Sequence, residues 1–101
     1  MKIQIFLVPV CLFMLCTMAH AHSLYFTLSD DGENTVEMEA LFSTGALAAG
    51  ATVRLYDKQG GKVIWKGKTD EYGTCIFQRP DVPYEVELDA GPGHQSRGDG
   101  I

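Results

Sequence analysis

The chain has 101 residues and a formal net charge of −5, with 13 Asp and Glu residues against 8 Lys and Arg residues. An acidic balance without a Lys/Arg cluster argues against nucleic-acid binding, which depends on cationic contacts to phosphates. The same balance argues against docking on an anionic lipid surface.

The first 21 residues have the three parts of an export signal. Lys2 forms a short basic region, an almost unbroken apolar run extends from Ile3 to Met18, and Ala19-His20-Ala21 supplies small residues for cleavage. We therefore expect cleavage after Ala21 and a periplasmic or secreted protein without stable membrane insertion. The alternative is an uncleaved membrane anchor, although the apolar run is shorter than the ~20 residues of a spanning helix.

Removal of this signal leaves about 80 residues, enough for one small domain with a modest core. Two of the three cysteines, Cys11 and Cys16, leave with the signal, so Cys75 has no intramolecular disulfide partner. We expect Cys75 to be a buried apolar residue, and the alternative is an exposed soft metal ligand. The fold must then depend on packing alone.

Residues 22–95 show short alternating runs separated by turn residues, a pattern typical of a β-sandwich. Six strands are expected, at Leu24 to Leu28, Val36 to Phe42, Thr52 to Asp57, Val63 to Lys66, Cys75 to Phe77 and Tyr84 to Asp89. A seventh would fall near residues 22–24 or 94–97, residues 44–50 would connect two sheets, and residues 96–101 are expected to form a flexible tail. The sequence therefore predicts an all-β fold, a small antiparallel Greek-key β-sandwich of about seven strands preceded by a signal peptide.

One stretch carries a resemblance at the level of the fold. Residues 50–77 contain Gly-Ala-Thr-Val-Arg-Leu-Tyr-Asp, followed by Gly-Lys-Thr-Asp-Glu-Tyr-Gly-Thr-Cys-Ile-Phe. This stretch resembles the carboxypeptidase regulatory-like, transthyretin-type β-sandwich, in which a Gly-x-Thr-Asp-x-x-Gly turn joins two strands. The resemblance implies that Asp70 caps the turn and that Gly73 adopts a conformation that other residues resist.

A second resemblance concerns function. The run Asp89-Ala90-Gly91-Pro92-Gly93-His94, the run Phe42-Ser43-Thr44-Gly45 and a mature start at His22 are similar to the small exported accessory proteins of energy-coupling-factor nickel and cobalt uptake systems. The similarity extends over nearly all of the mature chain. It implies a non-enzymatic periplasmic protein that binds Ni²⁺ or Co²⁺ and has a membrane metal transporter as its partner.

The candidate metal ligands are His22 and His94. A histidine at the amino terminus offers its α-amine and its imidazole to one ion, and His94 adds a second imidazole. Asp89 is a candidate to orient His94, as carboxylates do for histidine ligands. Cu²⁺ would bind the same nitrogens, although Leu24 at mature position three excludes the amino-terminal copper motif with a histidine there. The alternative is that His22 merely follows the cleavage site and that His94 is a solvated loop residue.

No catalytic motif is present, neither a nucleophile paired with a base nor HExxH, and we do not expect an enzyme. The alternative function is a metal-free interaction module that docks through a sheet edge or an aromatic face. Candidate surfaces are an aromatic platform and an acidic face, although both residue sets are typical of ordinary strand positions. The platform would comprise Tyr25, Tyr56, Trp65 and Tyr84, and the acidic face Glu37, Glu39, Glu85 and Glu87.

Overall fold

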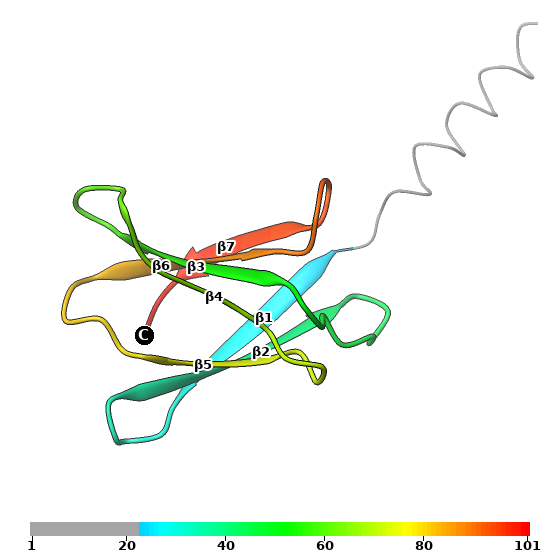
Figure 1. Cartoon of the computed structure of the whole chain (residues 1–101), viewed down its shortest axis with the longest axis horizontal. Helices are drawn as coiled ribbons and strands as arrows, with labels where there is room; N and C mark the ends of the chain where they lie inside the picture. Colours follow the sequence, from blue (N-terminus) through cyan, green and yellow to red (C-terminus); the bar gives the residue numbers. More distant parts are fainter. Residues whose placement is uncertain (1–22) are drawn as a thin grey trace, which may run out of the picture.

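The computed structural model describes residues 23–101, so the predicted signal and the candidate ligand His22 lie outside the described residues. Seven strands make up this part of the chain (Figure 1): β1 (Leu24–Asp30), β2 (Thr35–Phe42), β3 (Thr52–Asp57), β4 (Val63–Lys68), β5 (Thr74–Gln78), β6 (Tyr84–Asp89) and β7 (Gln95–Asp99). All strand pairs are antiparallel, and the predicted all-β sandwich of about seven strands is confirmed. Residues 23–101 contain no helix that is long and apolar enough to cross a membrane.

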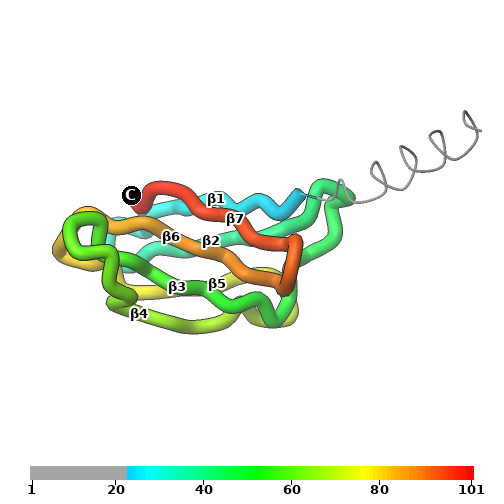
Figure 2. The backbone as a smooth tube through the Cα atoms, turned by 90° about the horizontal axis from the view of Figure 1, so that it is seen from above, coloured from blue at the N-terminus to red at the C-terminus, as the bar shows by residue number. Residues whose placement is uncertain are grey.

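The strands form two sheets, one in the order β1-β2-β5 and the other in the order β4-β3-β6-β7. The chain passes from the first sheet to the second after β2, returns after β4 and crosses again after β5. The first crossing uses residues 44–50, so the expected role of this Gly- and Ala-rich segment is confirmed. Figure 2 shows β1 and β7, the outer strands of the two sheets, running side by side at one edge of the sandwich.

Between the sheets lies one core, formed mainly by alternate residues of β2, β3, β5 and β6, as the sequence pattern predicts. Its fully buried side chains are Val36, Met38, Val53, Leu55, Val86 and Leu88. Cys75 is only 6% exposed and belongs to this core, which confirms its prediction as a buried residue. Burial raises the pKa of the Cys75 thiol above its usual value, because the thiolate would lose its hydration there.

The flexible tail predicted for residues 96–101 is wrong, because most of this segment belongs to β7 and pairs with β6. The Arg97 side chain anchors the strand, since its Nε donates a hydrogen bond to Glu85 at 3.0 Å. Its guanidinium also lies 4.1 Å from the centre of the Tyr56 ring, in a cation–π contact.

The composition of β7 explains why the sequence pattern gave residues 94–97 only as one of two places for a seventh strand. The strand reads Gln-Ser-Arg-Gly-Asp and contains no apolar side chain of its own. At Gly98, an added Cβ would lie 3.3 Å from the Phe26 ring, so a side chain from β1 occupies the space that β7 leaves. The strand is therefore stabilised by backbone pairing and by a neighbour's aromatic ring, neither of which produces an alternating pattern.

The turn between β4 and β5 shows the two local roles that the Thr-Asp-x-x-Gly motif implies. Asp70 Oδ1 accepts hydrogen bonds from the backbone N–H groups of Tyr72 and Thr74, both at 2.9 Å. Gly73 has a φ of +75°, in the left-handed region that glycine tolerates without strain. The motif therefore closes the turn by side-chain capping at one end and by a glycine conformation at the other.

Thr69, the residue before this cap, fastens the turn to the crossing between the sheets. Its hydroxyl is buried, accepts a hydrogen bond from Ala51 N–H at 2.8 Å and donates one to the Ala48 carbonyl at 2.6 Å. The same side chain therefore satisfies two backbone groups of the connection that follows β2.

We expect Thr69→Val to lower the free energy of unfolding by about 2–4 kcal/mol, because it keeps the shape and leaves those two backbone groups without partners. Urea unfolding measures the loss. Thr69→Ser is the matched control, since it keeps the hydroxyl and removes only a methyl group. If the valine variant were as stable as the serine variant, the two hydrogen bonds would not matter to the fold.

Candidate metal site

His94 lies in the hairpin that joins β6 to β7. Two backbone hydrogen bonds close this hairpin, one from Ala90 N–H to the His94 carbonyl at 2.8 Å and one from His94 N–H to the Gly91 carbonyl at 2.9 Å. Gly91 has a φ of +114°, which a residue with a side chain would adopt only with strain. The Gly-Pro-Gly-His run thus builds a tight loop that holds the backbone of His94 in place.

Asp89 supports this loop and does not orient the His94 ring, so its expected role is wrong. Its Oδ1 accepts a hydrogen bond from Gly91 N–H at 2.9 Å, and its Oδ2 accepts one from Arg54 at 3.3 Å. The Gly91 N–H and then the Arg54 guanidinium hold the pKa of the Asp89 carboxyl below its usual value. Both carboxylate oxygens of Asp89 therefore already have partners, the Gly91 N–H and Arg54 of β3.

The His94 ring is half-buried and packs against Phe42, the last residue of β2. The two ring centres are 5.7 Å apart with an interplanar angle of 89°, an edge-to-face contact. His94 Nδ1 is buried and has no hydrogen-bond partner among residues 23–101. A buried polar atom left without a partner costs about 1–3 kcal/mol, so a hydrogen-bond partner for this nitrogen would stabilise the arrangement.

The start of β1 lies at the same end of the sandwich (Figures 1 and 2). Ser43 N–H donates to the Ser23 carbonyl at 2.8 Å, and Ser23 N–H donates to Ser43 Oγ at 3.2 Å. Leu24 pairs with Phe42 in the β1–β2 register. The segment Phe42–Ser43 thus contacts both Ser23, the neighbour of His22 in sequence, and the ring of His94.

The four glutamates of the candidate acidic face do not form one surface. Glu37 and Glu39 lie on β2, whereas Glu85 and Glu87 lie on β6 in the other sheet. The second pair is neutralised, because Glu87 forms an ion pair with Arg54 at 2.8 Å and Glu85 pairs with Arg97. The four glutamates therefore do not form one acidic face.

The four aromatic residues of the candidate platform are also dispersed. Tyr84 is buried in the core, and Trp65 packs against Phe77 with ring centres 5.6 Å apart. Tyr56 lies beneath Arg97, and only Tyr25 is widely exposed, at 54%. An aromatic docking face is therefore excluded for these four residues.

No group of three or more His, Cys, Asp or Glu side chains that could hold a metal ion occurs within residues 23–101. The predicted ligand set accordingly depends on His22, which precedes this range. The prediction for His94 identified a residue in a well-defined loop, and the structure adds Phe42 and Ser43 as the residues that connect it with the start of β1.

No protein-family model, no curated protein and no solved structure matches this chain. The chain is therefore defined by its fold as a small antiparallel β-sandwich, and the resemblance to metal-uptake accessory proteins stays a prediction.

Proposed function

We propose that this protein is a periplasmic, non-enzymatic accessory protein of metal uptake that binds Ni²⁺ or Co²⁺ through His22 and His94 and delivers the ion to a membrane transporter. One observation carries the proposal. Ser23 and the His94 ring both contact the segment Phe42–Ser43. Ser23, which directly follows His22 in the sequence, is thereby fixed at the same end of the sandwich as His94.

The chemistry of the donor set supports a borderline divalent ion. A terminal α-amine has a pKa near ~7.7–8.0 and is partly deprotonated at neutral pH, so it can close a chelate ring with the imidazole of the same residue. A second imidazole from His94 raises the number of nitrogen donors, which Ni²⁺, Co²⁺ and Cu²⁺ favour. Copper handling through the same histidines is the second candidate, because Cu²⁺ binds such a site more tightly than Ni²⁺.

The decisive experiment is a calorimetric titration of Ni²⁺ and Cu²⁺ into protein that begins at His22 and into a version with one alanine placed before His22. The extension keeps the imidazole and converts the histidine's α-amine into a peptide nitrogen. We expect at least tenfold weaker binding, a loss of about 1.4 kcal/mol or more.

Two further samples complete this experiment. His94→Ala in the protein that begins at His22 should also weaken binding, whereas Gln95→Ala is a matched control beside it whose side chain is exposed. If the extended and unextended proteins bound the metal equally well, the terminal α-amine would not be a ligand. If His94→Ala bound as well as the unsubstituted protein, His94 would not be a ligand. An intact mass of the exported protein that does not start at His22 would contradict the proposed site before any titration.

A further inference from the structure

The free edge of β5 is the least protected sheet edge in the described part of the chain. Of the other outer strands, β1 and β7 run side by side, and β4 bears Lys66 and Lys68, charges that discourage strand addition. β5 reads Thr-Cys-Ile-Phe-Gln and contains no charge. Its Ile76 side chain is 64% exposed.

Two hydrogen bonds, one at each end of the β2–β5 pair, determine which backbone groups of β5 face outward. Ala40 N–H donates to the Gly73 carbonyl, and Arg79 N–H donates to the Asn34 carbonyl. In an antiparallel ladder the hydrogen-bonded residues alternate, so the odd-numbered residues from 73 to 79 face β2 and the even-numbered ones face the free edge.

Only two residues of this edge offer both a donor and an acceptor. The N–H and C=O of Thr74 are bonded to Asp70, and Pro80 has no N–H. The backbone groups of Ile76 and Gln78 have no partner among residues 23–101. A short template for one added strand therefore lies between Thr74 and Pro80.

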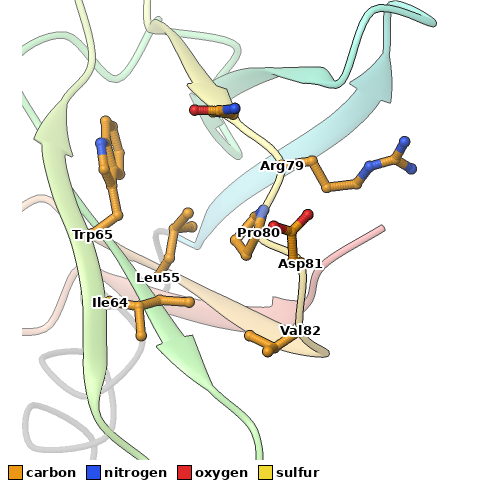
Figure 3. Close-up of a pocket in the computed structure, with 8 residues that line it drawn as sticks. Leu55, Ile64, Trp65, Arg79, Pro80, Asp81 and Val82 are labelled. Atoms are coloured by element: carbon orange, nitrogen blue, oxygen red, sulfur yellow. The ribbon is translucent and has the colours of Figure 1, made fainter.

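A hollow of about 350 Å³ lies beside this template (Figure 3). Ile64 and Trp65 of β4 line one side, Leu55 lies between, and the connection from β5 to β6 lines the other side with Pro80 and Val82. A strand added at β5 would direct alternate side chains toward the space between the sheets. The hollow is therefore in position to receive one of them.

A β-bulge in β4 shapes the side of the hollow that Ile64 and Trp65 line. Leu55 pairs with Trp65, whereas the next residue, Tyr56, pairs with Val63, so Ile64 is the extra residue of β4. Bulges redirect side chains and interrupt the alternation of a strand. Ile64 and Trp65, which are neighbours in sequence, consequently both line the hollow.

The uncompensated charge at the rim is negative. The Arg79 guanidinium forms an ion pair with Asp30 at 2.8 Å, and its side chain points away from the hollow in Figure 3. The Asp81 carboxylate has no ion pair or hydrogen bond with any of residues 23–101. A cationic side chain of an incoming segment would find its counter-charge at Asp81.

We propose that this edge binds an extended segment of a partner protein by strand addition. The segment pairs with Ile76 and Gln78, inserts one large apolar side chain between Ile64 and Val82, and places a Lys or Arg beside Asp81. The docking edge lies at the end of β2 opposite to Phe42, because Gln78 pairs with Thr35. The inference is thus independent of the metal proposal, and a metal-loaded protein could use both ends at once.

The test uses a panel of synthetic seven-residue peptides, blocked at both ends, with a central Leu, Phe or Trp flanked by Thr and Lys. A twin panel carries Glu in place of Lys. Titration into metal-free, isotope-labelled protein is followed through backbone amide shifts and amide hydrogen exchange. We expect a Lys-flanked peptide to shift and protect the amides of Ile76 and Gln78, and its Glu twin to bind at least about fivefold more weakly at low salt.

Matched variants separate backbone pairing from side-chain contact. Gln78→Pro removes the outward N–H and leaves the bonds to β2, and it should weaken binding at least about tenfold, whereas Gln78→Ala keeps the N–H and should bind within about twofold of the parent. Val82→Lys should weaken peptide binding, because it places a charge where the apolar side chain of the peptide would enter the hollow. Leu47→Lys is the control, since Leu47 is exposed and does not line the hollow. If the proline variant does not fold, the comparison of Val82→Lys with Leu47→Lys still tests the proposal.

Three results would overturn the proposal. The first is that no Lys-flanked peptide shifts the amides of Ile76 and Gln78. The second is binding that Val82→Lys leaves unchanged. The third is protection of these amides that grows with protein concentration in the absence of peptide, because a second copy of the chain would then occupy the edge.

Discussion

Gly73→Ala is expected to lower the free energy of unfolding by at least about 3 kcal/mol, which combines the cost of a left-handed alanine with the loss of a buried backbone hydrogen bond. Gly73 has a φ of +75°. An added Cβ would lie 2.5 Å from the Ala40 carbonyl oxygen and 3.2 Å from the Ala48 nitrogen. Both are backbone atoms, so no side chain can move aside, and the bond from Ala40 N–H to the Gly73 carbonyl must break or lengthen.

Gly61→Ala is the matched control for this substitution. Gly61 has a φ of +70°, but an added Cβ would meet no atom within 4 Å. It should cost only the conformational penalty, about 1–2 kcal/mol. Urea unfolding followed by the fluorescence of the single tryptophan, Trp65, measures both variants. Equal losses would show that strand β2 does not press against the turn as closely as the structure indicates.

The elements that the sequence predicts well are those in which one strand carries its own pattern. In β2, Val36, Met38 and Ala40 are buried and alternate with exposed glutamates, so the strand can be identified without reference to its neighbours. β7 is the opposite case, since its inward positions are Ser96 and Gly98 and the apolar contact at Gly98 comes from Phe26. Information about β7 therefore resides in β1 and β6, where a local pattern cannot show it.

In the candidate metal site, too, local features can be read from the sequence and contacts between distant strands cannot. The alternative interpretation of His94 as a solvated loop residue places it in a loop, and in the structure it lies in the hairpin between β6 and β7. The contact of His94 with Phe42 depends on how the β6–β7 hairpin lies over the end of β2, which no spacing in the sequence encodes. Asp89 is close to His94 in sequence, yet its register opposite Thr52 turns its carboxylate toward Arg54.

The docking edge of β5 could not be predicted from the sequence either, because its role depends on how the strands are arranged. Ile64 becomes part of the hollow only through the register shift between β3 and β4. The absence of charge from β5 is visible in the sequence, but its meaning depends on β5 being the outer strand of its sheet. An uncharged strand in the centre of a sheet would call for no explanation.

Leu88→Ala is expected to lower the free energy of unfolding by about 2–5 kcal/mol, the range for a buried leucine that leaves a cavity. Leu88 is 0% exposed and lies on β6, between β3 and β7 in its sheet. Residues 23–101 contain a single cysteine, Cys75, and therefore no disulfide that could limit the unfolded chain. A domain of this size has a total stability near the lower end of about 5–15 kcal/mol, so the substitution removes a large share of it.

Thermal unfolding provides the comparison with a position on the outer face. Each kcal/mol corresponds to about 4–8 °C in Tm for a domain of this length, so Leu88→Ala should lower Tm by at least ~8 °C. Ile76→Ala, on the exposed face of β5, should change stability by no more than about 0.5 kcal/mol. The same Ile76→Ala variant retains the backbone groups that the proposed partner strand would use. If both variants lost equal stability, Ile76 would already be covered in solution, and the β5 edge would not be free to bind a partner.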